Sequence, residues 1–297
     1  MKQKKFACWV CGIEEPQPYK ASNLGPGISA QDFAITDVNY GVTGELVKCA
    51  QCGFVQCSNL TDVLNYYEDL KDPSYEATRK GRALQADKML SVILEYAKGK
   101  KLLDIGAGSG ILVEQAQERG FTAMGVEPSR WLWQKAQVRD LPVFLGTFPH
   151  PNSKDFFDVI TLIDVIEHVP DPVGLLKDAE KALSPEGIIV VATPDIGALL
   201  ARILGKAWWH LRVAHIGYFN VKTLKLAAGR AGLISIYEGR AKWYFALDYV
   251  LARFNGYLPN FAKLPPKKFL QRITIPLNLG DSMFLMFKRQ AGLPPKV

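Results

Sequence analysis

The stretch Lys101-Leu102-Leu103-Asp104-Ile105-Gly106-Ala107-Gly108-Ser109-Gly110 decides the fold of this 297-residue chain. It predicts an apolar strand ending near an acid, then a turn with three glycines, then a helix that opens at Ile111. Glycine permits backbone angles that side chains forbid, and it lets the main chain approach a bound nucleotide closely. Many nucleotide-binding proteins carry such a turn, so this stretch alone leaves the ligand open.

The glycine spacing separates two kinds of cofactor site. A dinucleotide-binding turn reads G-x-G-x-x-G and is followed about 20 residues later by an acid for the ribose. This chain reads D-x-G-x-G-x-G over 104–110, and the relevant later acid is Glu127, 17 positions after Gly110. Glu127 follows the second predicted strand, Thr122–Val126, where a carboxylate can accept both ribose hydroxyls. The spacing therefore disfavours a nicotinamide dehydrogenase.

A third motif completes the set. Residues 157–172 read F-D-V-I-T-L-I-D-V-I-E-H-V-P-D-P, which predicts a strand running into a polar turn. Together the three motifs resemble the class I S-adenosylmethionine-dependent methyltransferases, especially the small-molecule branch with D-V-I-E-H-V-P-D-P at a strand end. The resemblance covers residues 98–235. It implies a Rossmann-like α/β fold with a seven-stranded doubly wound sheet whose last strand is antiparallel.

The apolar runs and helix caps fit this sheet. The expected strands are Lys101–Ile105, Thr122–Val126, Pro142–Leu145, Asp158–Ile163, Gly187–Ala192, Ile234–Glu238 and Ser282–Lys288. Helices are expected near 111–119, 129–138 and 172–183, and from about Asn220. Residues 61–97 read as a helical linker, and in families resembling this one such a segment often covers the cofactor as a lid. Tyr75, Arg79 and Arg82 could then reach the cofactor or the substrate; a solvated helix face is the alternative.

The resemblance also implies a cofactor site at the carboxyl ends of the strands, where ligands of open α/β sheets bind. The glycine turn would wrap the methionine part, Glu127 would hold the ribose, and Thr147 and Phe148 would flank the adenine. The expected cofactor-binding residues are Asp104, Gly106, Ala107, Gly108, Gly110, Glu127, Pro128, Thr147, Phe148, Ile163 and Asp164. The family often has an acid near the adenine, but this chain reads G-T-F-P-H over 146–150, which leaves adenine recognition to backbone atoms. Capping of nearby amides is the alternative role for Asp104 and Asp164.

Two histidines are the expected catalytic residues. Methyl transfer from a sulfonium is a direct displacement, so a base is needed only where the acceptor starts protonated. His168 comes just after the fourth strand, and His215 lies in an H-x-x-Y-F segment that lines the acceptor pocket in the family. A hydrogen-bonded structural imidazole is the alternative for each. Asp164, Glu167 and His168, spaced i, i+3 and i+4, could also face one divalent cation.

Residues 1–60 predict a zinc-ribbon-like domain. Cys8, Cys11, Cys49 and Cys52 form two C-x-x-C pairs, each followed by a glycine. Four thiolates make a closed tetrahedral zinc site, which is structural because no position stays open. Four unrelated buried cysteines or a redox pair are the alternatives, and Cys57 reads as a plain thiol.

The charge of the chain is divided unevenly along its length. Residues 200–297 hold 16 Lys and Arg against 3 Asp and Glu, whereas residues 1–199 hold 20 against 26, and the net charge is +7. Within a methyltransferase domain over 98–297, residues 196–219 read as an acceptor-pocket insertion. Residues 240–254 read as an apolar aromatic helix flanked by basic residues, typical either of a membrane-surface segment or of a partly exposed core helix. The basic aromatic segment 240–272 therefore predicts peripheral membrane contact as one option.

The sequence predicts a cytoplasmic enzyme, with an association at the inner membrane face as the further option. It has neither an apolar run of the roughly 18 residues that cross a bilayer nor a signal peptide. The favoured acceptor is a small molecule: a sugar, a nucleotide-sugar or a lipid-linked intermediate, with phosphate character suggested by the basic tail. A quinone-type O-methyltransferase is the close alternative. Nucleic-acid methylation is disfavoured because the N/D-P-P-Y/F motif is missing, and a non-catalytic cofactor-binding protein is the remaining reading.

Overall fold

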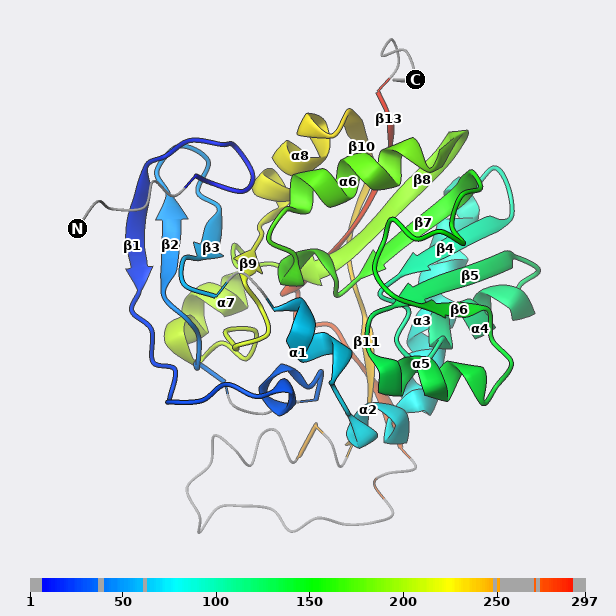
Figure 1. Ribbon diagram of the computed structural model, residues 1–297, viewed down its shortest axis with the longest axis horizontal. Coiled ribbons are helices and arrows are strands. Elements are labelled where there is room, and N and C mark those ends of the chain that lie inside the picture. Colours follow the sequence, from blue (N-terminus) through cyan, green and yellow to red (C-terminus); the bar gives the residue numbers. More distant parts are fainter. Residues whose placement is uncertain are drawn as a thin grey trace.

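A computed structural model describes residues 7–36, 40–60, 63–247, 250–251, 270 and 273–290. A seven-stranded sheet forms the centre of the fold (Figure 1). In spatial order its strands are β10 (Leu233–Arg240), β13 (Ser282–Arg289), β8 (Leu183–Pro194), β7 (Phe157–Ile163), β4 (Lys101–Ile105), β5 (Thr122–Glu127) and β6 (Val143–Leu145). The strands from β8 to β6 pair in parallel, whereas β13 is antiparallel to both of its neighbours. The predicted doubly wound sheet with an antiparallel last strand is confirmed.

Helices cover both faces of this sheet. One face carries α3 (Arg79–Tyr96), α4 (Ile111–Glu118) and α5 (Arg130–Gln137), and the other carries α6 (Pro172–Lys181) and α8 (Val221–Arg230). Successive residues of a strand point to opposite faces. Accordingly, Leu102 of β4 packs in the cluster of α3 and α4, while its neighbour Leu103 packs in the cluster of α6 and α8. Figure 1 shows α6 and α8 together, away from α3 and α4.

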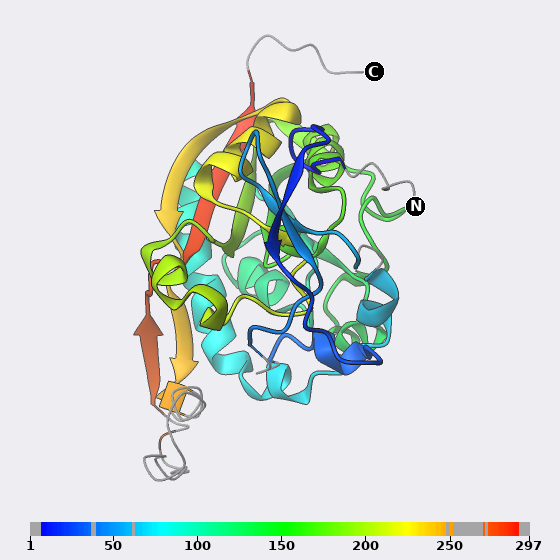
Figure 2. The same cartoon turned by 90° about the vertical axis from the view of Figure 1, so that its left-hand side faces the viewer.

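A second, antiparallel sheet stands beside the first (Figure 2). Its strands are β1 (Pro16–Lys20), β2 (Leu46–Cys49), β3 (Val55–Cys57) and β9 (Gly217–Tyr218). The fourth strand comes from the predicted insertion 196–219, because β3 pairs with β9 in the register Val55 to Tyr218. The buried side chains of this sheet share a core with those of the insertion, such as Trp208 and Ile216.

Short helices surround the space between the two sheets. They are η1 (Ala30–Phe33), α1 (Leu64–Glu68), α2 (Pro73–Ala77), η2 (Ile166–His168), α7 (Leu199–Leu204) and η3 (Gly205–Ala207). Figure 1 places α1 between the sheets and α2 close to it. The buried carboxylate of Asp72 begins α2 by accepting the backbone N–H of Tyr75, and it also accepts both the N–H and the hydroxyl of Thr36. One acid therefore joins the lid segment to the loop that follows η1.

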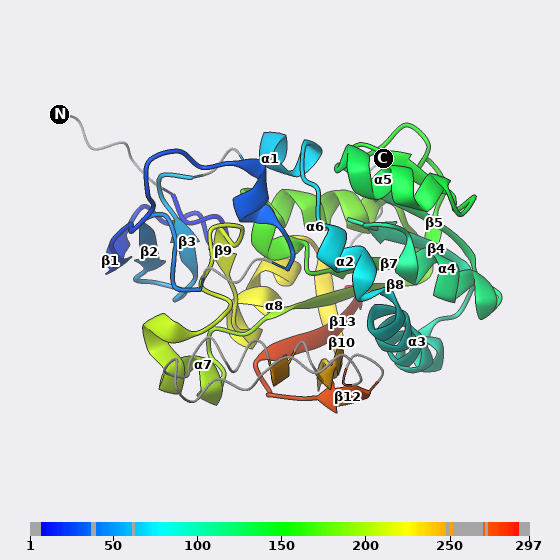
Figure 3. The same ribbon diagram turned by 90° about the horizontal axis from the view of Figure 1, so that it is seen from below.

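The expected helix over 240–254 is wrong for residues 240–246, whereas Leu247, Val250 and Leu251 are helical. Trp243–Ala246 forms a strand, β11, that pairs antiparallel with β12 (Thr274–Leu277) below the main sheet (Figure 3). Aromatic residues favour strands, and the strand partner lies far along the chain, so local periodicity could not reveal it. Residues 252–269 lie outside the described part of the chain.

Smaller differences concern element ends. The fifth strand begins at Leu183 rather than Gly187, because residues 184–186 continue it across a break in register opposite Phe157. Within the described residues, no helix combines the length and the apolar character that crossing a bilayer requires.

Candidate active site

The turn after β4 requires its glycines. Gly106, Gly108 and Gly110 have φ angles of 75°, 56° and 75°, which side chains rarely adopt. A Cβ atom at Gly106 would lie 2.6 Å from Val165 Cγ2, and one at Gly108 would lie 2.6 Å from the Tyr75 hydroxyl. Gly110 precedes α4 and does not line the cavity described below, because Leu141 occupies the space beside it.

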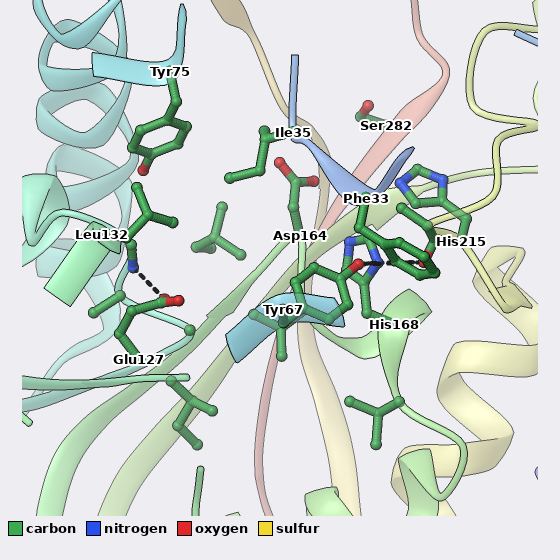
Figure 4. Close-up of a pocket in the computed structure, with 18 of the residues that line it drawn as sticks. Phe33, Ile35, Tyr67, Tyr75, Glu127, Leu132, Asp164, His168, His215 and Ser282 are labelled. Atoms are coloured by element: carbon green, nitrogen blue, oxygen red, sulfur yellow. Dashed lines mark hydrogen bonds between the residues drawn. The ribbon is translucent and has the colours of Figure 1, made fainter. Parts of the chain in front are cut away.

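Two buried acids stand at neighbouring strand ends. Glu127 accepts the N–H of Gly108 at 2.7 Å and that of Ser129 at 2.8 Å, so one carboxylate links the glycine turn to the start of α5 (Figure 4). Asp104 accepts the hydroxyl of Thr161 at 2.6 Å. Burial raises the pKa of each acid to about 7, against the hydrogen bonds that lower it.

Asp164 occupies a strained position just beyond β7. Its φ angle is 53°, an uncommon value for a residue other than glycine, and such residues cluster at functional sites. Burial raises the pKa of Asp164 to about 7, while the positive charges of Arg82 and Arg212 oppose this rise. Figure 4 shows its carboxylate between Tyr75 and the histidines.

The lid segment contacts the glycine turn through two side chains. Arg79 donates to the Ser109 hydroxyl at 2.9 Å and pairs with Glu114 at 2.5 Å, so it holds α3 against α4. Arg82 lies over the Tyr75 ring at 4.2 Å from its centre, and both line the cavity. Of the three residues expected to reach the cofactor or substrate, Tyr75 and Arg82 thus line the cavity. Arg79 instead binds Ser109 and Glu114.

His168 and His215 face each other with their ring centres 4.9 Å apart. His168 Nδ1 lies 2.6 Å from the Ala214 carbonyl, and His215 Nδ1 lies 2.8 Å from the His210 carbonyl. A carbonyl only accepts, so each Nδ1 carries the proton and each Nε2 keeps a free lone pair. Burial lowers the pKa of His168 to about 4 and that of His215 well below its usual range, so both rings are neutral near pH 7.

Glu167 joins this pair of imidazoles. Its Oε2 accepts the Thr193 hydroxyl at 2.8 Å, whereas its buried Oε1 has no hydrogen-bond partner in the described part of the chain. One ligand atom each from Glu167, His168 and His215 lie within 4.8 Å of one another. The expected cation-binding group is therefore corrected in one member: His215 takes the place of Asp164, whose left-handed backbone precedes η2.

Three nearby residues were not predicted as site residues. The Tyr67 hydroxyl lies 2.6 Å from His168 Nδ1, the His210 ring stacks 5.8 Å from that of His215, and the buried Arg212 lies at the same place. They come from α1 and from the insertion and meet only in three dimensions. The H-x-x-Y-F signal pointed to His215 but not to its neighbours.

One cavity of about 1190 Å³ connects these groups. It is lined by all expected cofactor-binding residues except Gly110 and by both expected catalytic histidines. Beyond Asp164 it widens into a largely apolar chamber. Side chains from η1, α1, α7, β11 and β12 form its wall, among them Phe33, Val63, Leu200, Leu204, Trp243 and Leu277.

The four paired cysteines cluster away from this cavity. Cys8 Sγ lies 3.6 Å from Cys52 Sγ, Cys11 Sγ lies 3.5 Å from Cys49 Sγ, and all four sulfurs are within 4.8 Å of one another. Arg230 of α8 donates to the Val10 carbonyl at 3.0 Å and fixes the first cysteine turn against the main domain. Cys57 is not part of this group; its thiol donates to the Asn59 side chain.

A doubly wound sheet with a glycine turn and buried acids at its strand ends defines a Rossmann-like cofactor-binding protein. Residues 77–236 match the family described as Methyltransferase domain, and the chain belongs to that family. The predicted methyltransferase is thereby confirmed at the level of the family, which also supports the predicted S-adenosylmethionine cofactor.

Similar proteins of known name match parts of the chain. The Ubiquinone biosynthesis O-methyltransferase of Idiomarina loihiensis is 35% identical over 104 residues, covering 32% of this chain and 42% of its own length. That of Actinobacillus pleuropneumoniae is 32% identical over 110 residues, covering 32% of this chain and 46% of its own length. The chain thus spans less than half of these relatives. A chain from the complex of the Haloferax volcanii Trm112 methyltransferase activator with a methyltransferase shares the fold, with a TM-score of 0.52 at 15% identity, and the match covers 73% of this chain and 94% of that one.

Proposed function

We propose that this protein transfers a methyl group from S-adenosylmethionine to a hydroxyl of a small, largely apolar acceptor. One observation carries the proposal: a single cavity joins the glycine turn and Glu127 to the histidine pair and the apolar chamber. A donor at one end and an acceptor at the other would meet beside Asp164, and burial would exclude water from the transfer.

The residues at the strand ends fit the cofactor. The space beside Gly106 and Gly108 has no room for a Cβ atom. Because glycine has none, the backbone at these positions can lie close to a ligand. The Glu127 carboxylate keeps a lone pair on each oxygen for the ribose hydroxyls. Asp164 and Arg82 offer opposite charges for the amino and carboxylate groups of the methionine part. When bound, the cofactor supplies an electrophilic methyl group.

The histidine pair would accept the proton of the acceptor hydroxyl. Both Nε2 atoms have free lone pairs, and Nδ1 of each ring is held by a carbonyl, which fixes the ring orientation. His168 and His215 remain the proposed catalytic residues on this ground. Glu167, whose pKa burial raises well above its usual range, lies next to them.

A divalent cation at the same place is the second candidate mechanism. One ligand atom each of Glu167, His168 and His215 lie within 4.8 Å of one another, and Glu167 Oε1 has no hydrogen-bond partner among the described residues, which suits a metal ion. A cation there would lower the pKa of a bound hydroxyl. Chelation that abolishes activity without changing the circular dichroism spectrum supports this candidate; unchanged activity in EDTA favours the histidines alone.

The lining of the chamber favours a quinone-type acceptor, the alternative of the sequence analysis, over a nucleotide sugar. A sugar needs many hydrogen-bonding groups, whereas the chamber beyond Asp164 is mostly aliphatic and aromatic. The matched relatives are named for ubiquinone biosynthesis, which points the same way. A lipid-linked acceptor also fits an apolar chamber, and membrane contact through 240–272 and a cytoplasmic location stay predictions.

Structural zinc is proposed at Cys8, Cys11, Cys49 and Cys52. Four sulfurs within 4.8 Å of one another, on two turns whose Gly12 and Gly53 have φ angles near 80°, suit one tetrahedral ion. The ion would hold together a small sheet that has little core of its own.

Calorimetric titration with S-adenosylhomocysteine tests the cofactor part first. We expect micromolar binding by the wild type, at least tenfold weaker binding by Glu127→Gln, and no change for Glu186→Gln at an exposed position of β8. An acceptor screen with alkylated phenols and with nucleotide sugars then decides the substrate class. Lack of binding by the folded protein, or methylation of sugars alone, contradicts the proposal.

A further inference from the structure

Arg212 is a buried cation that forms no direct ion pair with any carboxylate in the described part of the chain. Only 8% of the residue is exposed, and it lines the cavity next to the histidine pair. Its Nη1 donates to the Ile35 carbonyl at 2.9 Å and its Nη2 donates to the Ala34 carbonyl. Among the residues that the structure describes, no carboxylate pairs with its guanidinium, and its buried Nε–H has no acceptor.

Such an arrangement is costly for the protein alone. Arginine is almost never fully buried unless it is paired, and an unpaired buried donor costs about 1–3 kcal/mol. The carbonyls of the η1 loop fix the guanidinium in place but do not neutralise it. A second orphan atom, Glu167 Oε1, lies in the same polar cluster, so the region offers one unused donor and one unused acceptor.

Two carboxyl groups, Asp164 and Glu167, lie near enough to Arg212 for their charges to interact with it, but within the described residues neither forms an ion pair with its guanidinium. The chamber therefore presents the positive charge of Arg212 inside a mostly apolar wall.

We propose that the side chain of Arg212, which lines the cavity, binds an oxyanion of the acceptor. The inference rests on the proposed function for the identity of this ligand as the acceptor. The oxyanion can be a permanent acid group of the acceptor or the phenolate left when the accepting hydroxyl loses its proton. Both put a negative oxygen beside the guanidinium, and both restrict the substrate to apolar molecules that carry or can form one anionic oxygen.

The test compares ligands that differ only in charge. The full-length protein, with and without S-adenosylhomocysteine, is titrated calorimetrically with 4-butylbenzoate and with its neutral amide, 4-butylbenzamide. We expect the wild type to bind the carboxylate at least about tenfold more tightly, and Arg212→Gln to bind both equally. The matched control Arg202→Gln, on the exposed side of α7, should keep the wild-type preference.

The second arm separates the two sources of the oxyanion. 4-Nitrophenol absorbs differently as phenol and phenolate, so its apparent pKa can be read in the bound state. A lowered pKa on the wild type that returns toward the free value in Arg212→Gln indicates the phenolate; a carboxylate preference without this shift indicates a permanent acid. If the wild type shows neither the carboxylate preference nor the pKa shift, the proposal is overturned.

A second variant keeps the test valid if Arg212→Gln folds poorly. Arg212→Lys keeps the charge but loses the second carbonyl contact, so it should retain part of the carboxylate preference even where Arg212→Gln is unstable. Binding of S-adenosylhomocysteine is the separate readout for the proposed function. If Arg212→Gln binds the cofactor normally and keeps the carboxylate preference, only the proposed role of Arg212 is refuted. If the wild type does not bind the cofactor, the proposed function is refuted.

Discussion

Glu127 connects three parts of the cofactor half through one side chain: the end of β5, the glycine turn and the first residues of α5. Both of its oxygens already accept a backbone N–H, so its charge is partly compensated although it is buried. Single residues of this kind set the properties of the site, because each buried polar atom without a second partner is available to a ligand.

The pH dependence of cofactor binding follows from this carboxylate. Burial raises the pKa of Glu127 to about 7, so the group gains a proton as the pH falls through that value and no longer accepts from the ribose hydroxyls. We expect the affinity for S-adenosylhomocysteine to fall by up to about tenfold per pH unit below neutrality. Titrations over about pH 5.5–8.5 measure it. An equal slope in Glu127→Gln would show that another group, such as Asp104, is responsible.

The stability of the free protein should depend on pH with the opposite sign. The pKa of Glu127 is raised above its ordinary value of 4.5, so the native state holds this proton more tightly than the unfolded chain does. The stabilisation is complete below about pH 4.5 and is lost as the pH rises through about 7. The difference in unfolding free energy between wild type and Glu127→Gln, measured at both ends of this window, reports it.

Gly108→Ala tests the glycine turn. The new methyl group would meet the Tyr75 hydroxyl at 2.6 Å in addition to the strain of a φ angle of 56°. We expect a loss of stability of about 2–4 kcal/mol and at least tenfold weaker S-adenosylhomocysteine binding. Gly120→Ala has the same kind of strain, with a φ of 78°, but meets open space, so it should cost about 1 kcal/mol and leave binding unchanged. Equal effects of the two changes would exclude the contact with Tyr75.

Among the elements, α2 and η1 show how the lid is attached. The buried Asp72 accepts three hydrogen bonds, two of them from Thr36 in the loop after η1. That loop also supplies the carbonyls that hold Arg212. The lid over the glycine turn and the wall of the acceptor chamber are therefore one connected unit.

Asp72→Ala should loosen this unit. Three partly buried donors lose their acceptor, so we expect a cost of about 3 kcal/mol in urea unfolding and faster hydrogen exchange at residues 34–36 and 73–79. Asp171 begins α6 before a proline in the same manner, but it is exposed and accepts one N–H. Asp171→Ala should cost about 1 kcal/mol and leave the lid unchanged. Similar exchange in both variants would contradict the connection.

The elements also show what the sequence could predict. β4 has the predicted bounds, and the glycine turn and the caps at Asp171 and Asn220 appear as expected, because their signals lie within a few adjacent residues. β11 was mistaken for a helix because its partner β12 lies some thirty residues away. Arg212 and Tyr67 gave no local signal, since their roles arise only where α1 and the insertion meet.

At the scale of the whole molecule, the cysteine cluster supports the chamber from outside. The small sheet that carries it shares its core with Trp208 and Ile216 of the insertion, and the insertion carries His210, Arg212 and His215. Loss of the ion from the cysteine cluster should therefore weaken acceptor binding more than cofactor binding.

Removing one thiol tests this. Cys11→Ser should contain less than the one zinc ion per chain expected for the wild type, and its melting temperature should be lower by at least about 5 °C. It should bind 4-butylbenzoate more weakly and S-adenosylhomocysteine nearly as well as the wild type does. Cys57→Ser, which changes a buried thiol outside the cluster, should keep the metal. Full zinc occupancy in Cys11→Ser, measured by atomic emission, would refute the four-thiolate site.

The pairing of β3 with β9 has a consequence for synthesis of the protein. Val55 leaves the ribosome long before its strand partner Tyr218, so the first three strands emerge with one edge uncovered. Until the insertion is translated, the two cysteine turns are the early means of holding these strands in register. An ion bound by the nascent chain would then hold the first three strands together and limit the association of the uncovered edge with other chains until β9 is synthesised.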